Sequence, residues 1–434
     1  MTPEVKNRIA QIRRGEVPEG YKRTNIGIMP SQWAKAQIKD ICEINPCKDK
    51  NINGEVTFLS MADVSENGEI LNQNRIDIKN IKNGLTPFKR GDILVAKITP
   101  CFENGKGALT ASLITGYGFG STEFHVLRSK INSAFLFYHT ISYRFRQKLK
   151  NEMTGSAGQK RVQTGSLASY SLGFPPDAEQ QKIASILSTQ DKIIDLKERL
   201  LEEKKQQKKY LMQQLLTGKK RLPGFSEEWE NFGFNDVFCT LPTNTLSRED
   251  MCKSGGIIRN IHYGDVLIHY GEVLNINEED VPYIIEGKEP AHYMQVENGD
   301  VIIADTAEDM TVGKTTEIQN IKTDKVVSGL HTICCRPIKK YFCEGWLGYY
   351  MNSEEYHGQI KRLACGSKVF SISKTEIKKT RLRIPCINEQ KEIIDILSTK
   401  NREIALSEQS IKAEKQKKKA LMQLLLTGIV RVKI

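Results

Sequence analysis

The sequence predicts an α+β protein in which two globular α/β domains are separated by two long antiparallel coiled-coil helices, related by a pseudo-two-fold internal repeat. Three observations lead to this fold class. One helix-ending phrase occurs twice, each copy carries a seven-residue apolar repeat, and the globular segments repeat more faintly. The chain is therefore divided into a leader helix, a first globule, a central spacer helix, a second globule and a C-terminal spacer helix, at residues 1–28, 29–174, 175–219, 220–384 and 385–434.

The helix repeat is visible in the letters themselves. The phrase "LMQQLLTG" (211–218) returns 210 residues later as "LMQLLLTG". At the same offset "EQQKIASILST" (179–189) returns as "EQKEIIDILST", and no gap is needed from Pro175 to Gly218. The match predicts two helices of one length and one register.

The ends of both helices carry recognisable signals. Pro175 and Pro385 precede the helices, and a proline favours a helix start. Gly218 and Gly428 follow a threonine at the other end, where glycine adopts the left-handed conformation that closes a helix. About 40 residues at 1.5 Å each make a rod of roughly 60 Å.

A seven-residue stripe runs along each helix and predicts a coiled-coil seam. The alternative is a helix packed on its own domain, against which stand the length and the Lys, Glu and Gln outside the stripe. Lys208 and Lys418 belong to the stripe as well. The apolar positions, which we predict as the seam and subunit interface, are Leu187, Ile194, Leu201, Leu215, Leu397, Ile404, Ile411 and Leu425.

The two globules repeat at an offset of 208 residues. "RGDILVAK" (90–97) corresponds to "NGDVIIAD" (298–305), and Arg128 corresponds to Arg336. A Gly-Asp pair followed by an apolar run predicts a tight turn that enters a buried strand. The polar residues otherwise differ, which indicates one task done twice on different targets.

The leader begins with a short helix signal. Thr2 precedes Pro3, and Val5, Ile9 and Ile12 lie on one face. We expect a capped helix that packs near the C-terminal rod.

Composition limits the class of protein. The 434 residues are 39% hydrophobic and carry a formal net charge of +12, which favours a polyanion partner. No run of about 18 apolar residues exists and the first residues lack an apolar signal region, so a cytoplasmic location without membrane contact is expected. The ten cysteines contain no C-x-x-C pair, so scattered reduced thiols are favoured over a metal site.

Catalytic motifs are incomplete. Gly313-Lys314-Thr315 resembles the end of a phosphate-binding loop, but Glu308 stands where that loop needs glycine. "GYGFG" (116–120) lacks the acidic residue of a dinucleotide site. "NPC" (45–47) lacks the second proline and the aromatic residue of an amino-methyltransferase pocket, and Glu286-Gly287-Lys288 has no partner acid. We expect a chain that is not an enzyme and that holds no cofactor and no metal.

Taken in order, these segments resemble the specificity subunit of type I restriction–modification systems over nearly the whole chain. The resemblance is carried by "GYKRTNIGIMPSQW" (20–33), echoed by "KRLPGFSEEWE" (220–230), and by two helices of pattern P-x-x-x-E-Q…L-L-T-G. "VTFLSMADVSENGEI" and "GDILVAKITPCFENGKGAL" complete it.

The resemblance implies a function. The globules would be target recognition domains, each reading half of a split double-stranded DNA sequence. The rods would hold the half-sites apart and dock two modification subunits, which carry S-adenosylmethionine and methylate adenine. A restriction subunit that uses ATP and Mg²⁺ would join to cleave.

Direct readout of DNA needs Arg, Lys, Asn and Gln at a surface held by phosphate contacts. The candidates are Lys97, Asn104, Lys106, Lys160 and Arg161 in the first globule, and Arg259, His262, Lys314 and Lys368 in the second. For each, the alternative is a solvated surface charge. The loops that hold most of them are 100–108, 155–161, 308–316 and 365–370.

A protein of another class fits the same outline. It is a coiled-coil adaptor that joins two protein-binding domains without DNA contact. Binding to DNA that weakens steeply with salt would separate the two hypotheses.

Overall fold

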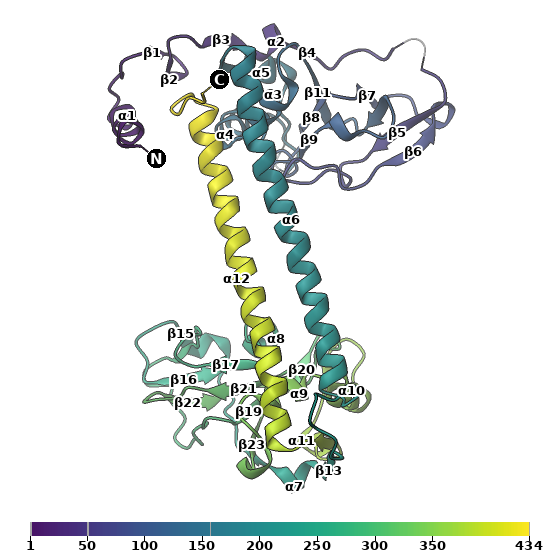
Figure 1. Cartoon of the computed structure of the whole chain (residues 1–434), viewed down its shortest axis with the longest axis vertical. Helices are drawn as coiled ribbons and strands as arrows, with labels where there is room; N and C mark the ends of the chain where they lie inside the picture. The colour runs from purple at the N-terminus through teal and green to yellow at the C-terminus, as the bar shows by residue number, and fades with distance from the viewer. Residues whose placement is uncertain (1, 50–51, 157, 434) are drawn as a thin grey trace. The chain divides into compact units, whose positions relative to one another are not determined.

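The computed structural model of the chain describes residues 2–49, 52–156 and 158–433 (Figure 1). It divides into two compact units, which are Met1–Glu198 with Ser410–Ile434, and Arg199–Gln409. We call them the first unit and the second unit. Each unit contains one globule and part of both long helices, so the unit boundary passes through the helices.

The first unit is a mixed α+β globule. Its main sheet has the strand order β4-β11-β8-β9, and a second sheet has the order β6-β5-β10-β7. Two strand pairs, β1-β2 and β12-β3, flank them. The strands are β1 (Tyr21–Thr24), β2 (Gly27–Pro30), β3 (Ala34–Gln37), β4 (Cys42–Ile44), β5 (Glu55–Leu59), β6 (Asn74–Asp77), β7 (Thr86–Lys89), β8 (Ile93–Ala96), β9 (Gly107–Leu109), β10 (Tyr117–Gly120), β11 (Phe124–Ser129) and β12 (Ser171–Phe174). The helices are α1 (Pro3–Arg13), α2 (Ile38–Ile41), α3 (Ser133–Thr140), α4 (Tyr143–Asn151) and α5 (Thr164–Ser169), with 3-10 turns at Ile78–Asn80 and Thr110–Ser112.

The second unit repeats this plan. Its main sheet has the order β14-β23-β19-β21-β17, its second sheet β15-β18-β16-β22, and its pairs are β13-β25 and β20-β24. The strands are β13 (Glu230–Gly233), β14 (Phe238–Leu241), β15 (Met251–Cys252), β16 (Ile258–Ile261), β17 (Val273–Asn275), β18 (Tyr283–Ile284), β19 (Val301–Ala304), β20 (Thr306–Ala307), β21 (Thr315–Gln319), β22 (Lys325–Ser328), β23 (Thr332–Pro337), β24 (Phe370–Ser371) and β25 (Arg381–Ile384). The helices are α7 (Phe234–Val237), α8 (Tyr263–Ile268), α9 (Trp346–Met351), α10 (Glu354–Leu363) and α11 (Lys374–Ile377), with 3-10 turns at Arg248–Asp250 and Lys339–Tyr341.

The central strand pair of each main sheet has the same register. In the first unit β11 runs antiparallel to β8 with Phe124 opposite Ala96. In the second unit β23 runs antiparallel to β19 with Thr332 opposite Ala304. Both pairs lie at the 208-residue offset of the sequence repeat, so the faint repeat marks one sheet scaffold built twice.

The long helices are α6 (Asp177–Leu215) and α12 (Ile387–Leu425), of 39 residues each. Gly218 and Gly428 follow their ends with φ of 67° and 70°, so the predicted left-handed closing glycines are confirmed. Within the first unit the helices run antiparallel, because Asp191 pairs with Lys418 while Glu198 pairs with Lys415.

Each globule packs on the start of one long helix and the end of the other. The core of the first unit includes Ile183 and Leu187 of α6 together with Leu425 of α12. The core of the second unit includes Ile393 and Leu397 of α12 together with Leu215 of α6. The stripe residues near the ends of the helices are therefore part of the hydrophobic cores of the globules.

The side chains of the stripe are all buried or half-buried. Ile194 and Ile411 are buried, and Leu201 and Ile404 are half-buried. Lys208 pairs with Glu272, and Lys418 pairs with Asp191. The chain itself thus buries much of the apolar stripe, and the use of these positions as a subunit interface stays a prediction.

The leader helix α1 packs beside the chain end. Thr2 caps it by accepting a hydrogen bond from the Val5 N–H. Arg8 donates to the Tyr21 hydroxyl, which in turn donates to the carbonyl of Gly428. These bonds connect the leader to the turn that ends α12.

Three further features concern the described residues only. No helix among them combines the length and the apolar character that crossing a membrane requires. They contain no group of three or more His, Cys, Asp or Glu side chains placed to hold a metal ion. The ten cysteines, all within this part of the chain, are free thiols.

Candidate nucleic-acid interface

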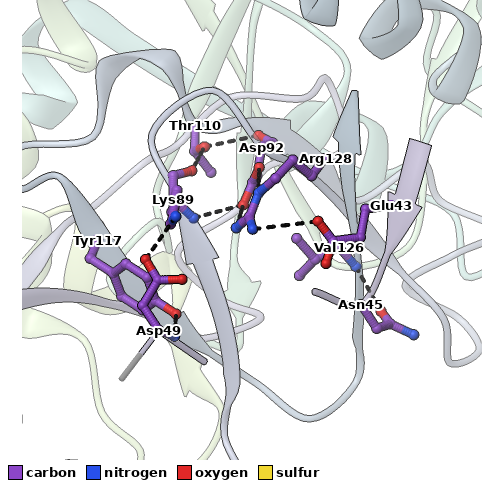
Figure 2. Close-up of polar contacts among 9 residues, drawn as sticks. All are labelled: Glu43, Asn45, Asp49, Lys89, Asp92, Thr110, Tyr117, Val126 and Arg128. Carbon is purple, nitrogen blue, oxygen red and sulfur yellow. Dashed lines mark hydrogen bonds and ion pairs between the residues drawn. The ribbon is translucent and has the colours of Figure 1, made fainter. Parts of the chain in front are cut away.

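The Gly-Asp turn before the central strand is fixed by a buried carboxylate (Figure 2). Asp92 accepts a hydrogen bond of 2.7 Å from the Lys89 N–H. Its two oxygens also accept from the Arg128 guanidinium, at 3.0 and 2.9 Å. Since Asp92 precedes β8 and Arg128 lies on β11, this pair fixes the register of the central strands.

The second unit has the same device at the corresponding positions. Asp300 accepts from the Glu297 N–H at 2.8 Å and from the Arg336 guanidinium at 3.0 and 2.8 Å. Gly91 and Gly299 both have φ of 91°, so the predicted tight turn into a buried strand is confirmed in both units. The Arg128 and Arg336 repeat is therefore structural.

Lys106 and Lys314, which each follow a glycine and lie 208 residues apart, make scaffold contacts too. The Lys106 ammonium donates to the Met61 carbonyl, and the Lys314 ammonium donates to the Leu267 carbonyl, both at 2.9 Å. Burial lowers the pKa of Lys314. Scaffolding accounts for the repetition of these lysines, and their role in DNA reading stays a prediction.

The predicted loops of the first unit come together where β8 ends and β11 begins. The Thr99 N–H donates to the Lys160 carbonyl, and the Val162 N–H donates to the Lys97 carbonyl, at 2.9 and 2.8 Å. The loop 155–161 therefore borders the strand end. Ala157, in the middle of that loop, lies outside the described residues.

The second unit brings its loops together in the same way. Strand β20, directly after β19, pairs with β24 at Thr306 opposite Ser371. The Ile372 N–H donates to the Asp305 carbonyl at 2.8 Å. We call these two places the loop edges: in the first unit β8 ends and β11 begins there, beside loop 155–161, and in the second unit β19 ends and β23 begins there, beside loop 365–370.

The predicted DNA-reading residues of the first unit differ in exposure and in their hydrogen-bond partners. Lys160 is exposed and Lys97 is half-buried. Asn104 is exposed and donates to a Glu66 carboxylate oxygen at 2.9 Å. Arg161 is paired with Glu123 through its Nε and Nη2 atoms, at 3.1 and 2.9 Å.

In the second unit, Lys368 lies exposed on the 365–370 loop. Arg259 is engaged elsewhere, because it pairs with Asp324, donates to the Ile276 carbonyl and covers the Tyr283 ring. The structure thus groups Lys97, Lys160, Arg161 and Lys368 with the loop edges and leaves Arg259 on β16.

His262 is mostly buried in the second unit. It caps α8 by accepting from the Gly264 N–H at 3.2 Å. Burial, followed by the nearby charge of Arg248, lowers its pKa. His262 therefore has a structural role, and a contact with DNA stays a prediction.

Sequence reasoning missed three residues at the loop edges, Glu123, Asp305 and His331. Glu123 holds Arg161, and His331 Nδ1 lies 3.4 Å from an Asp305 carboxylate oxygen. The sequence repeat could have indicated two of them. Glu123 and His331 are 208 residues apart, and each directly precedes a buried strand.

Two copies of one sheet scaffold that present different side chains at the same edge define a protein with two recognition modules. The chain belongs to the type I restriction modification DNA specificity domain family, whose family model matches residues 30–206 and 226–415.

Curated relatives are named as specificity subunits of type I restriction enzymes. A putative type I restriction enzyme MjaX specificity subunit from Methanocaldococcus jannaschii is 24% identical over 96% of this chain and 97% of its own length. The type I restriction enzyme EcoAI specificity subunit from Escherichia coli is 39% identical over 36% of this chain. That match spans about a quarter of the EcoAI subunit, at 27% of its length.

Solved structures share the fold. A chain from work on complex assembly and conformational transition of the type I R-M system has a TM-score of 0.61 and 17% identity, over 93% of this chain and 99% of that chain. The HsdS subunit from Thermoanaerobacter tengcongensis has a TM-score of 0.51 and 18% identity, over 93% and 98%. Together with the repeated family match, these structures confirm a two-domain α+β fold.

Proposed function

We propose that this chain is the non-catalytic specificity subunit of a type I restriction–modification complex, and that it reads a bipartite double-stranded DNA target. One observation carries the proposal. The two units keep the buried carboxylate–arginine pairs Asp92–Arg128 and Asp300–Arg336, whereas the side chains at their loop edges differ. A constant scaffold with variable edges suits two modules that read different half-sites.

Charge supports DNA as the ligand. The net charge of +12 favours a polyanion, and Lys160 and Lys368 lie exposed on the loops that border the two edges. Phosphate contacts of this kind position a protein, and base contacts then specify the sequence.

We further propose that α6 and α12 pair as an antiparallel coiled coil that acts as spacer and as docking surface for two modification subunits. Leu196 and Leu406, at the 210-residue offset, remain 63% and 59% exposed. Two equivalent exposed leucines on polar helices suit two copies of one partner, since apolar surface of this kind marks interaction sites. S-adenosylmethionine, ATP and Mg²⁺ would be held by the partner subunits.

The test of DNA reading is selection from a random duplex pool by the purified chain, at several salt concentrations. We expect enrichment of two short, different half-sites at a fixed spacing, and affinity that falls steeply with salt. A protein-binding adaptor would enrich no sequence and would overturn the proposal. Methylation mapping in cells that hold the chain and its modification subunit should recover the same target.

A further inference from the structure

The two loop edges place different chemistry on one backbone position. The Lys97 N–H donates to the Glu123 carbonyl at 2.9 Å, and the Asp305 N–H donates to the His331 carbonyl at 3.0 Å. Lys97 and Asp305 directly follow β8 and β19, whereas Glu123 and His331 directly precede β11 and β23, in the same register. Lys97 and Asp305 are thus structural equivalents, as are Glu123 and His331.

The hydrogen-bonding character of the equivalent side chains is opposite. In the first unit the Lys97 ammonium has no hydrogen-bond or ion-pair partner among the described residues, so its donors are available. In the second unit Asp305 offers a carboxylate, which accepts from the Thr306 hydroxyl at 2.8 Å and has a second oxygen left over. One edge presents a donor and the other presents an acceptor.

His331 extends the acceptor character of the second edge. Its Nδ1 lies 3.4 Å from both the Asp305 carboxylate and the Thr306 hydroxyl. In the neutral tautomer that carries its proton on Nδ1, facing the carboxylate, Nε2 has a free lone pair. The side chain is 48% exposed, so this acceptor is within reach of a ligand.

The backbone of His331 is held in an unusual conformation. Its φ is 53°, in the left-handed region that residues other than glycine rarely adopt. The Tyr263 ring packs edge-on against the imidazole, with ring centres 5.3 Å apart. A strained, supported residue at an exposed edge is typical of functional sites.

We propose that the side chains at these equivalent positions select one base in each half-site: Lys97 takes the acceptor edge of guanine, and Asp305 with His331 takes the exocyclic amino group of adenine or cytosine. In the major groove, guanine offers O6 and N7 as acceptors, while adenine N6 and cytosine N4 are donors. The inference rests on the proposed DNA-reading function and names the residues that make the two half-sites different.

A purely structural role for the pairs is the competing explanation. The repeated pairs that hold the scaffold, Asp92–Arg128 and Asp300–Arg336, place a buried carboxylate against arginine in both units. The edge positions are more exposed and change chemistry between units. Scaffold closure at these positions is already supplied by backbone hydrogen bonds, which do not depend on the side chain.

The test uses the full chain and a random duplex pool, with Asp305→Asn and His331→Asn. Asparagine tolerates the left-handed backbone of His331, so this substitution preserves the turn. Each variant should lose preference at the same single base pair of one half-site by about tenfold, with the other half-site unchanged. Asp280→Asn, at an exposed acid of the second unit outside the predicted loops, serves as control and should keep the base profile.

A transplant gives the sharper result. The double variant Asp305→Lys with His331→Asn should move the preference at that base pair from adenine or cytosine to guanine, and Lys97→Asp should weaken a guanine in the other half-site. Thermal unfolding confirms that each variant is folded.

The outcomes separate the two levels of the proposal. A wild-type chain that enriches no sequence overturns the DNA-reading function and this inference with it. A wild-type chain that enriches a bipartite target, with folded Asp305→Asn and His331→Asn variants that give the same profile as Asp280→Asn, overturns the inference alone.

Discussion

Arg431 lies against Glu179, 252 residues earlier in the chain, and its guanidinium donates to both carboxylate oxygens at 2.6 and 2.7 Å. Glu179 also accepts from the Trp33 indole at 3.2 Å and is fully buried. The second unit repeats this arrangement, because Glu389 accepts from Arg221 at 2.7 and 2.8 Å and from the Trp229 indole. In each unit, an arginine that follows the closing glycine of one long helix thus pairs with a buried glutamate in the first turn of the other long helix. We call this pair the clamp.

We expect Arg431→Ala to destabilise the first unit by about 3–5 kcal/mol, because it leaves the buried Glu179 carboxylate without its cation. Arg221→Ala should do the same to the second unit. Arg14→Ala, which removes a solvent-exposed pair with Glu16, should cost far less, because water and salt screen exposed ion pairs. Denaturant unfolding measures all three, and equal losses for Arg431→Ala and Arg14→Ala would refute the clamp.

The stripe on α6 gives a matched pair of substitutions. Ile194 is 8% exposed, whereas Leu196, two residues along, is exposed. Ile194→Asp buries a charge and should cost several kcal/mol, while Leu196→Asp should change the free energy of unfolding by less than about 0.5 kcal/mol. The melting temperatures of the two variants decide, and a stable Ile194→Asp chain would contradict the packing of the stripe.

The exposed leucines should affect assembly instead. Leu196→Asp and Leu406→Asp place a charge on the two proposed docking faces, and each should remove one copy of the modification subunit from the complex. Native mass spectrometry counts the copies. Lys192→Asp, an exposed position of α6, is the control. Two bound copies in the double leucine variant would exclude these faces as the docking surface.

The second unit should lose stability as the pH rises towards neutrality. Burial raises the pKa of Glu317 from 4.5 to about 7, even though the Gly345 and Gly348 N–H groups donate to its carboxylate. Between these values the folded state binds more protons than the unfolded state, so stability falls with pH, by about 3 kcal/mol in total. Hydrogen exchange of the second unit should show this slope, and Glu317→Gln should flatten it.

The first unit should show the opposite slope. Burial, with a smaller effect of the Arg144 charge, lowers the pKa of His139 from 6.5 to about 3. The unfolded state therefore binds more protons in this range, and stability present above pH 6.5 is lost as the pH falls towards 3. We expect His139→Gln to remove this loss in hydrogen exchange of the first unit. An unchanged slope would mean that His139 is not its source.

Local patterns in the sequence were enough for the features that depend on neighbouring residues. The seven-residue period and the closing glycines Gly218 and Gly428 predicted the two helices, because helix geometry repeats and left-handed backbone favours glycine. The Gly-Asp turns at Gly91 and Gly299 were predicted for the same reason, and the repeat predicted a fold of two similar halves.

Only the tertiary structure determined which residues distant in the sequence contact each other. Nothing local to Arg431 indicates that its partner is Glu179, since that contact depends on how α12 returns to the start of α6. Lys106 was predicted to read DNA because its residue type suits that role, and only the position of the Met61 carbonyl shows its scaffold contact. Asp305 and His331 lie 26 residues apart in the sequence. These two residues lie side by side because β19 and β23 pair in the sheet. Strand register is a property of the whole sheet, and it sets which side chains face each other.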